Sequence, residues 1–449
     1  MKDTKEIISY LKDKGFVYSG SSIYGGLANS WDYGPLGAML KDNIKNEWKK
    51  FFIDQEPEQI YHFDSGIILN SNVWKSSGHI AKFNDPMIDC KSCKSRYRAD
   101  HLIEEKTNLN PDNLNFEEQT EIIHKKIKCP NCKKRDWTKV RSFELMFKTS
   151  NSKINNEDNL YLRPETAQGI FINFKNVINS LNPKIPFGIG QVGKSFRNEV
   201  TPGNFIFRTK EFEQLELEFF VKPEETEKWF DYFLNKIREF LLKLGLDKKN
   251  IKEFDVDKES LAHYSSKTID FEYKFSFGWG EILGFANRGD FDLKNHSLNS
   301  NEKLNYSIAN SNEKYYPHVL EISMGVERLF FALISELFIE NKKREILKLP
   351  FSLAPYKVSI MPLTNKLNEE AKKLYNELLK KNIGPINFST GGSIGKRYRK
   401  QDSIGTFFVI TYDFDTAKDE SVTIRNRDTM NQERILIKNI NEYIKNNAK

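Results

Sequence analysis

Residues 196–218, which read FRNEVTPGNFIFRTKEFEQLELE, constrain the fold more than any other segment of this chain. They predict two strands joined by a turn at TPGN, with Arg197 and Glu199 on the first strand. Side chains alternate between the two faces of a strand, so one face of the second strand would carry Arg208, Lys210, Phe212, Gln214 and Glu216, and the other Glu213, Leu215, Leu217 and Phe219. Guanidinium groups, one ring and a carboxylate on a single face suit a nucleotide. Taken alone, however, the segment is more typical of a surface hairpin of mixed charge.

The composition predicts a globular protein of several domains. A chain of 449 residues has room for about two to four domains, and its 34 Phe and 18 Tyr supply core material. The net charge of +7 suits a polyanionic partner, although a Lys-rich surface explains it equally well. No apolar run is long enough to span a membrane, and Asp3, Glu6 and Asp13 are unlike a signal or transit peptide. We therefore expect a cytoplasmic protein without a membrane partner.

All four cysteines fall in two C-x-x-C pairs, Cys90 with Cys93 and Cys129 with Cys132. Each short turn presents two sulfur atoms to one ion, so two such pairs are typical of a closed tetrahedral zinc site. Disulfides are the alternative in a secreted protein, but a reducing cytoplasm argues against them. We expect a structural Zn²⁺ with no open position for catalysis, and a helix over residues 115–126 between the two pairs.

Hydrophobic periodicity divides the rest of the chain. Pro35 opens an amphipathic helix that runs past Trp48, and a second helix is predicted over residues 223–244. Residues 61–88 are expected to form short strands and loops, and residues 295–314, rich in Asn, Ser and Lys, a long solvated loop. Beyond Pro350, alternating strand and helix patterns predict a separate α/β domain.

Three further clusters bear on chemistry. LRPETAQG places Glu165 and a hydroxyl on a turn before an apolar helix, and on its own is more typical of a helix cap. Residues 277–284 combine glycines with Glu281, which suits close approach of the backbone to a ligand and a magnesium ion. HVLEISMGVER turns from a strand into a helix with Arg328 in its first turn. A cation there opposes the helix dipole and indicates an anionic partner such as a triphosphate; an exposed arginine is the alternative.

These motifs resemble those of class II aminoacyl-tRNA synthetases: FRNE with FRTKEFEQLELE, a strand-to-helix G-x-x-R, and an upstream helix begun by a proline turn. WDYGPLG, SGHIAKFNDPMIDC, YRADHL, LRPETAQGIF, GWGEILGFANRGDFDL and GGSIGKRYRKQDSIGTFFVITYDFDT resemble, more narrowly, the dimeric glycyl-tRNA synthetases. The resemblance covers residues 8–440. It implies an α+β fold with a class II catalytic domain on an antiparallel sheet (residues 1–88 and 141–349), a zinc-binding insertion (89–140) and a C-terminal α/β anticodon-binding domain (350–449).

The resemblance also implies the residues of the site. Arg197 would contact the α-phosphate of ATP, Phe212 would stack on adenine, and Arg328 would hold the far end of the triphosphate, so that both arginines serve catalysis. The implied ATP-binding set is Arg197, Asn198, Glu199, Phe207, Arg208, Thr209, Lys210, Glu211, Phe212, Glu281, Ile282, Gly325, Val326, Glu327 and Arg328. The implied glycine-binding set is Arg98, Glu165, Phe212, Glu213, Gln214, Leu215, Glu216, Glu321, Ile322, Ser323, Met324 and Gly325. Three carboxylates carry more negative charge than one ammonium group can neutralise, so we expect some of them to be paired with Arg or Lys.

The activity implied is that of a glycine–tRNA ligase, which forms glycyl-adenylate from glycine and ATP with Mg²⁺ and transfers glycine to the 3′ end of tRNA(Gly). The resemblance further implies a homodimer, through residues 31–52. A catalytically inactive nucleic-acid-binding paralogue is the alternative, but such a chain has no reason to keep both Arg197 and Arg328. Specificity for proline, threonine or serine is a second alternative, against which WDYGPLG and EFEQLELE argue.

Two departures from the family pattern are Ile322, where Pro is common, and Gly203, where Arg is common. They put the local detail of the pocket and of the loop that faces the tRNA acceptor end in doubt. The C-terminal domain resembles the family's anticodon-binding module, and one of its segments supplies cationic and stacking groups suited to unpaired RNA bases. The residues of that segment are Arg397, Tyr398, Arg399 and Lys400.

Overall fold

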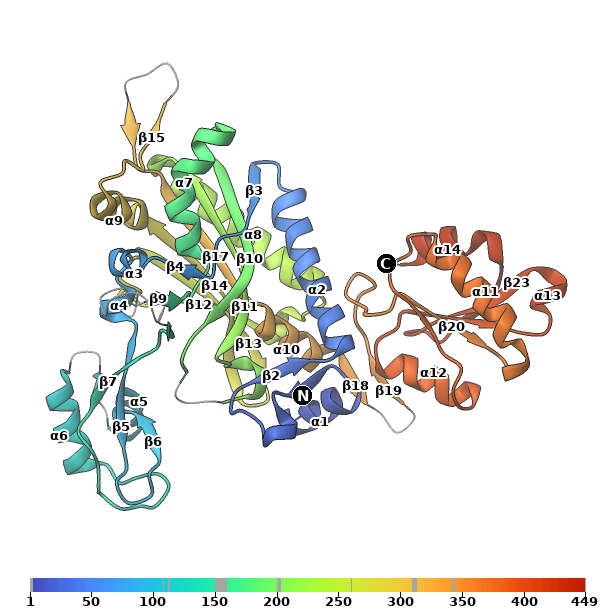
Figure 1. Cartoon of the computed structure of the whole chain (residues 1–449), viewed down its shortest axis with the longest axis horizontal. Coiled ribbons are helices and arrows are strands. Elements are labelled where there is room, and N and C mark those ends of the chain that lie inside the picture. Colours follow the sequence, from blue (N-terminus) through green and yellow to red (C-terminus); the bar gives the residue numbers. More distant parts are fainter. Residues whose placement is uncertain are drawn as a thin grey trace.

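The computed structural model describes residues 3–107, 109–111, 114–149, 160–199, 203–259, 261–308, 313–340 and 344–448. Its three parts are a large central body built on a seven-stranded sheet, a small module at one end and an α/β domain at the other (Figure 1).

The central sheet has the strand order β12-β13-β14-β17-β11-β10-β3. Its neighbours are antiparallel except for β10 and β3, which run parallel. The strands are β3 (Gln59–Phe63), β10 (Phe187–Phe196), β11 (Glu211–Val221), β12 (Ile251–Asp255), β13 (Lys267–Phe275), β14 (Gly278–Gly289) and β17 (His318–Gly325). The middle strands β14, β17, β11 and β10 therefore form the floor on which the site is built.

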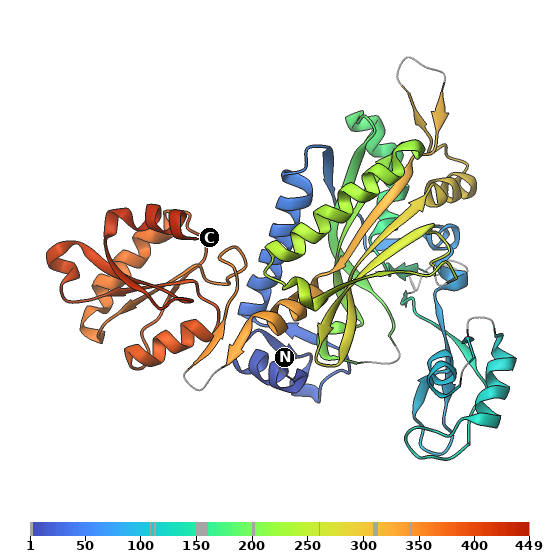
Figure 2. The ribbon, with the colours of Figure 1, turned by 180° about the vertical axis from the view of Figure 1, so that it is seen from behind.

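Helices cover both faces of this sheet (Figures 1 and 2). One face carries α1 (Thr4–Asp13), α2 (Pro35–Lys49, continued by a π-helical turn, Lys50–Asp54), α8 (Thr226–Lys243, after a 3₁₀ turn, Pro223–Glu225) and α10 (Val326–Leu337); the other carries α7 (Ala167–Leu181) and α9 (Phe291–Ser300). Leu215, Leu217 and Phe219 of β11 lie in the core beneath the first group, whereas Phe220 packs against Phe174 of α7. The alternation predicted for this strand, and the helices predicted from Pro35 and over residues 223–244, are confirmed.

The alternation does not extend to the residues before β11. This strand begins at Glu211, so Arg208 and Lys210 lie in the preceding loop, where Gly203 forms an isolated bridge with Arg208. Asn204 and Phe205 both adopt left-handed backbone angles (φ 59° and 60°) and lead into a 3₁₀ turn, Phe205–Phe207. The connection is therefore longer and more structured than the predicted turn, of which residues 201 and 202 lie outside the described part.

Two segments expected to lack helices contain them. Residues 61–88 include α3 (Ser71–Ser76), capped by the Asn70 side chain, and α4 (His79–Lys82). The predicted loop over residues 295–314 instead starts within α9, because Leu293 and His296 are buried against α7. The smaller strands are β1 (Val17–Ser19), β2 (Trp31–Tyr33), β4 (Ile68–Leu69), β8 (Lys148–Thr149), β9 (Leu160–Leu162), β15 (Tyr306–Ser307), β16 (Lys314–Tyr315), β18 (Phe338–Glu340) and β19 (Glu345–Leu347).

The small module is formed by a three-stranded sheet and two helices. Its elements are β5 (Asn84–Asp89), β6 (Arg96–Arg98), β7 (Arg141–Glu144), α5 (Ala99–Lys106) and α6 (Phe116–Lys126). The helix predicted between the cysteine pairs is α6, and Asn115 and Glu118 form a capping box at its start. Ile88, Ile103, Ile123 and Trp137 give the module a core of its own.

The C-terminal part has the predicted α/β fold, with a five-stranded sheet in the order β21-β20-β22-β23-β24. Its strands are β20 (Val358–Pro362), β21 (Ile386–Phe388), β22 (Phe408–Tyr412), β23 (Ser421–Asn426) and β24 (Gln432–Leu436), and its helices α11 (Asn368–Leu379), α12 (Ile394–Ser403), α13 (Thr416–Asp419) and α14 (Ile440–Asn447). Arg427 is buried at the joint with the central body and donates to the carbonyls of Leu349 and Gly405 at 2.6 and 2.9 Å.

The RNA contact expected of four residues, which lie on α12, requires exposed side chains, and the structure exposes only two of the four. Arg397 is buried, and its Nη1 donates to the carbonyl of Pro362 at 2.7 Å. The Tyr398 hydroxyl lies 2.6 Å from that of Thr411. These two side chains hold the domain together, whereas Arg399 and Lys400 are exposed and available to a partner.

Candidate active site

A pocket opens where the ends of the middle strands meet the start of α10. Its lining residues are Arg197, Glu199, Ile206, Phe207, Arg208, Thr209, Phe212, Gln214, Glu281, Ile282, Ser323, Gly325, Glu327 and Arg328. Most of them belong to the predicted ATP-binding set, which the fold therefore brings together from four separate stretches of sequence.

Arg197 is held at one wall of this pocket. It follows β10 directly, and its guanidinium lies 5.3 Å from the ring centres of both Phe83 and Phe212. Its Nε donates to the carbonyl of Pro164 at 3.0 Å. The two rings and the carbonyl fix the direction of the cation, which is what a contact to a phosphate requires.

Arg328 is held at the opposite side, in the first turn of α10. Its guanidinium lies 4.6 Å from the ring centre of Phe207, and its Nη1 donates to the backbone carbonyl and to the carboxylate of Glu281 at 2.9 and 3.0 Å. The expected partner of this cation is an anion such as a triphosphate, and the carboxylate that pairs with it within the chain is Glu281. Because that carboxylate is half exposed, a triphosphate can compete for the same guanidinium.

Glu216 lies deeper, on the same face of β11 as Phe212 and Gln214. It accepts hydrogen bonds from Gln214 Nε2 at 2.8 Å, from Ser323 Oγ at 3.0 Å and from the Thr166 hydroxyl. Its donors are thus neutral, and the side chain is buried. Burial, and then the charges of Glu321 and Glu165, raise the pKa of Glu216 to about 7, although the two hydroxyls oppose this.

Glu165 and Glu321 each have a cationic or ionisable partner. Arg288 Nη1 donates to Glu321 at 2.9 Å, and the same guanidinium is bound by Asp292. Burial raises the pKa of Glu321, and Arg288 offsets part of that effect. Glu165 lies 3.1 Å from His79 Nε2. Burial opposes the ionised form of Glu165, but His79, followed by Arg288, lowers its pKa overall.

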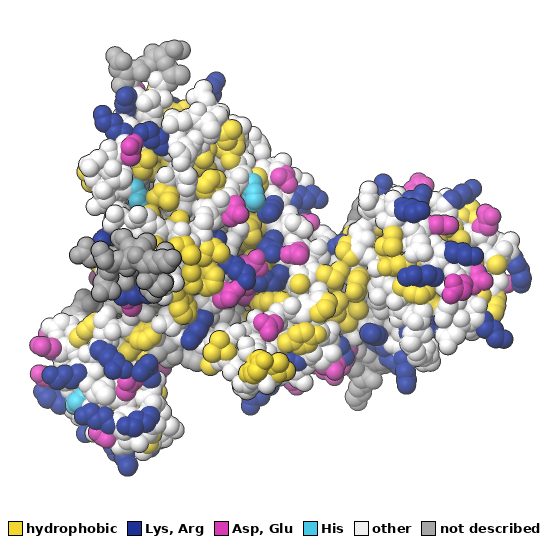
Figure 3. All heavy atoms as spheres, in the orientation of Figure 1, with side chains coloured by type: hydrophobic (Ala, Val, Ile, Leu, Met, Phe, Trp, Pro, Cys, Tyr) yellow, Lys and Arg dark blue, Asp and Glu magenta, His cyan; other side chains and the backbone are white. Residues whose placement is uncertain are grey.

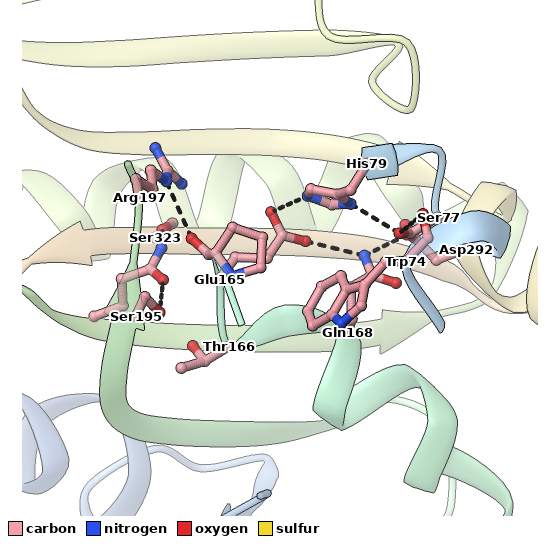
Figure 4. A network of polar contacts seen from close by, with 12 residues as sticks. Trp74, Ser77, His79, Glu165, Thr166, Gln168, Ser195, Arg197, Asp292 and Ser323 are labelled. Carbon is pink, nitrogen blue, oxygen red and sulfur yellow. Dashed lines mark hydrogen bonds and ion pairs between the residues drawn. The ribbon is translucent and has the colours of Figure 1, made fainter. Parts of the chain in front are cut away.

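Glu165 and Asp292 belong to one continuous polar network (Figure 4), which Arg288 extends to Glu321. Gln168 Nε2 donates to Glu165 and to Asp292, both at 3.0 Å, and Gln168 Oε1 lies 2.7 Å from His296. The expectation that some of the carboxylates are paired with Arg is confirmed for Glu321. LRPETAQG is therefore no simple helix cap, because Thr166 and Gln168 bind carboxylates instead of backbone groups.

The sequence interpretation missed His79, Arg288 and Asp292. Each lies within a quoted motif, SGHIAKFNDPMIDC or GWGEILGFANRGDFDL, but nothing local distinguished these residues from their neighbours. A buried acid needs a partner, so the surplus of carboxylates was the signal that could have directed attention to them.

Several residues of the predicted sets lie away from the pocket. Leu215, Ile322, Met324 and Val326 point into the core on the opposite face of the sheet, so the departure at Ile322 does not touch the pocket. Lys210 and Glu211 line a neighbouring cavity with Trp31 and Glu213, and Glu211 pairs with Lys194. Asn198 is near the pocket, and its backbone N–H donates to the carbonyl of Leu145.

Arg98 lies at the end of β6 in the module. It forms ion pairs with Asp85 at 3.0 Å and Asp100 at 2.5 Å. Burial opposes a high pKa for Arg98, but Asp100, Asp85 and Glu199 raise it overall. Among the described contacts, Arg98 is thus paired with carboxylates of the module and not with the three glutamates of the pocket.

The four cysteines meet in the module as predicted. Their sulfur atoms lie within 4.8 Å of one another, with 3.6 Å between Cys90 and Cys132 and between Cys93 and Cys129. A zinc ion with four bonds of about 2.3 Å would set neighbouring sulfurs about 3.8 Å apart. Cys90 and Cys129 are buried, all four are free thiols, and the cluster therefore fits a closed zinc site.

The largely antiparallel sheet, with one arginine after β10 and a second at the strand-to-helix turn of β17 and α10, defines a class II aminoacyl-tRNA synthetase catalytic domain. Residues 143–337 match the family "tRNA synthetase class II core domain (G, H, P, S and T)", residues 357–447 "Anticodon binding domain", and residues 85–117 "Glycyl-tRNA synthetase insertion domain 1". The chain belongs to the glycine–tRNA ligase family.

This membership rests on similarity over the full chain. The chain is 54% identical to the glycine–tRNA ligase of Mycoplasma capricolum subsp. capricolum, covering 99% of this chain and 98% of the relative. It is 48% identical to that of Bacillus thuringiensis subsp. konkukian, covering 99% of both. The predicted family, fold class and ligase activity are confirmed, and the inactive paralogue gains no support.

A solved structure shows the same fold at lower similarity. Prolyl-tRNA synthetase from Cryptosporidium parvum, complexed with halofuginone and AMPPNP, matches 98% of this chain and 76% of its own, with a TM-score of 0.64 and 15% identity. Within the described residues, no helix is both long and apolar enough to cross a membrane.

Proposed function

We propose that the chain activates glycine at the pocket between Arg197 and Arg328 and then passes it to tRNA. The carboxylate oxygen of glycine attacks the α-phosphorus of ATP, the bond to the β-phosphate oxygen breaks, and pyrophosphate leaves with its electron pair. The 3′-terminal hydroxyl of tRNA next attacks the glycyl carbonyl carbon, the bond from that carbon to the phosphate oxygen breaks, AMP leaves with its electron pair, and the hydroxyl proton passes to solvent. The observation that carries this proposal is two fixed guanidinium groups on either side of one pocket, with buried carboxylates behind it.

The nucleotide end of the pocket supports the first step. Negative charge builds on the α-phosphate oxygens as the carboxylate attacks, and a guanidinium that is already oriented stabilises this charge without reorganisation. Arg197 takes this role, Arg328 holds the far phosphates, and Phe212 offers its face to adenine. Mg²⁺ accompanies ATP as the substrate and screens the remaining charge.

The amino-acid end supports selectivity for glycine. Glu165, Glu216 and Glu321 receive the ammonium group, and Ser323 completes the pocket beside them. Side chains of larger amino acids would overlap with this rigid, hydrogen-bonded wall. Exclusion by overlap suffices here, because no amino acid is smaller than glycine.

Glycine-dependent exchange of pyrophosphate into ATP tests this assignment. We expect exchange with glycine, and background rates with alanine or serine. Exchange with another amino acid but not with glycine would overturn the assigned substrate.

The module and the C-terminal domain extend the proposal to zinc and tRNA. Cys90, Cys93, Cys129 and Cys132 would hold one Zn²⁺, which stabilises the module and takes no part in the reaction. Lys and Arg side chains gather on the surfaces of the module and of the C-terminal domain (Figure 3). These surfaces suit the phosphates of tRNA(Gly).

Metal analysis tests the zinc site. Protein purified without chelator should carry about one zinc per chain, as expected of a closed four-thiolate site. Cys90→Ser should lose this zinc and lower the thermal stability of the module. Ser92→Ala, in the same loop, should keep both, and zinc-free wild-type protein would refute the site.

We further propose a homodimer through residues 31–52 and the segment just before them. Ile23 and Tyr24 are each 86% exposed and Leu27 is 59% exposed, close to α2 in the chain. Exposed apolar side chains grouped in this way are typical of a protein interface. Sedimentation of the chain as a monomer at micromolar concentration would contradict this.

A further inference from the structure

His79 lies in a site built to hold its ring in one orientation. It opens α4, directly after Gly78, whose backbone is left-handed (φ 84°) and whose Cβ, if present, would lie 2.9 Å from His263 Nε2. The ring contacts Trp74 and Phe83 edge to face, with both centroid distances 5.5 Å. Only 6% of the residue is exposed.

Both ring nitrogens have a partner. Nδ1 lies 2.8 Å from Ser77 Oγ, and Nε2 lies 3.1 Å from Glu165 Oε2. An ionised carboxylate can only accept hydrogen bonds. The ring nitrogen of His79 that faces Glu165, Nε2, therefore carries a hydrogen and donates it. Ser77 can donate to Nδ1 of the neutral ring or accept from it in the charged ring, so the bond to Glu165 persists in both states.

His79 is one of the two side chains that donate to the carboxylate of Glu165. Gln168 Nε2 binds Oε1 at 3.0 Å, so each carboxylate oxygen has one donor and one further acceptor position. Arg288 lies near but is already bound to Glu321 and Asp292. Without His79, Glu165 would be a buried carboxylate beside other carboxylates, with one neutral donor.

We propose that His79 is a positioning residue for amino-acid binding: its Nε2–H holds Glu165 turned so that this carboxylate can receive the ammonium group of glycine. The inference rests on the proposed function, which assigns Glu165 to that group. His79 acts through Glu165 and does not itself touch the reacting atoms. Because α4 leads directly into β5, the first strand of the module, the same residue ties the root of the module to the amino-acid end of the pocket.

Three substitutions separate the hydrogen bond from the shape of the ring. His79→Gln places an amide nitrogen at the position of Nε2 and keeps the donor. His79→Met has similar length and removes it. His79→Asn keeps a polar group near Ser77 that does not reach Glu165, so it serves if the Met variant fails to fold. His124→Met, on the exposed face of α6, is the matched control.

Pyrophosphate exchange is measured against glycine and against ATP for each variant. The Met and Asn variants should raise the KM for glycine about tenfold to a hundredfold, the value expected for loss of one hydrogen bond to a charged group. Their KM for ATP, and their kcat at saturating glycine, should stay within about threefold of wild type, and His79→Gln should recover most of the glycine affinity. The His124 control should match wild type.

Two kinds of result would overturn the inference and can be told apart. An active wild-type chain whose glycine KM is the same in all His79 variants, or equally poor in Gln and Met, removes the role of His79 and leaves the proposed function intact. A wild-type chain without glycine-dependent exchange removes the proposed function and, with it, this inference.

Discussion

At the nucleotide end of the pocket the charged groups keep contact with solvent, whereas at the amino-acid end they are buried and hydrogen-bonded. The side chain of Arg328 is 25% exposed and that of Glu281 48%, while Glu216 is 1% exposed. The cations lie against aromatic rings, which hold them without removing them from water. The acids are held by hydroxyls, amides, the imidazole of His79 and one shared guanidinium.

This difference separates two tasks. A guanidinium stays charged at any physiological pH, so at the nucleotide end the fold has only to orient the two guanidinium groups. A buried carboxylate can lose its charge instead, so the amino-acid end has to control protonation as well as geometry. Substitutions at the first end should therefore damage catalysis, and substitutions at the second should damage glycine binding.

Arg197→Ala should produce the largest effect. It removes the oriented cation from the α-phosphate, and we expect about a thousandfold lower rate of glycine-dependent pyrophosphate exchange, the scale seen for loss of one fixed electrostatic contact. The thermal midpoint should change little, because the guanidinium makes one protein hydrogen bond. Arg197→Lys keeps the charge without the planar donor pair, so its exchange rate should lie between those of the wild type and the alanine variant. A loss of rate below tenfold in the alanine variant would contradict the assignment.

Glu216→Gln should affect the amino-acid end of the pocket. The substitution keeps the shape but removes the charge that meets the ammonium, so the KM for glycine should rise about a hundredfold while the KM for ATP stays constant. The substrate-free protein should become more stable, because a buried carboxyl without a cationic partner is unfavourable. Thermal melting with and without glycine checks both parts, and an equal rise in both KM values would erase the contrast between the two ends.

The part of the site that follows from local pattern was predictable from sequence. Strand alternation placed Phe212, Gln214 and Glu216 on one face and Leu215 and Leu217 on the other, because β11 is regular over that stretch. The prediction failed just upstream, where Asn204 and Phe205 turn the chain through left-handed angles. A phenylalanine in that conformation has no sequence signature.

The part that depends on distant partners was not predictable. Arg397 reads as a cation available to RNA, yet it is buried in the domain, where it donates hydrogen bonds to the carbonyls of Pro362 and Ser389. His79 reads as one residue of a short loop, and only the fold places Glu165 against it. For buried charges the sequence shows that a partner is needed but not which residue provides it.

A smaller effect, the pH dependence of glycine affinity, tests whether the amino-acid end controls protonation. With its pKa raised to about 7, Glu216 should be mostly neutral at pH 6 and mostly charged at pH 8, so glycine should bind about tenfold more tightly at pH 8. The affinity of ATP, which meets arginines, should not follow this curve. Isothermal titration at several pH values measures both ligands, and the Glu216→Gln variant should lose the dependence.

The same group should act with opposite sign on stability. The folded chain holds the Glu216 proton through the range in which the unfolded chain has released it, so its contribution to the free energy of unfolding is present below about pH 4.5 and is lost as the pH rises through about 7. Glycine should counter this loss, because its ammonium replaces the proton beside Glu216. The stabilisation by saturating glycine, measured as a shift in the thermal midpoint, should therefore grow from pH 6 to pH 8. A shift that is equal at both pH values would mean that Glu216 is already charged in the substrate-free pocket, and the contrast between the two ends would then be one of burial alone.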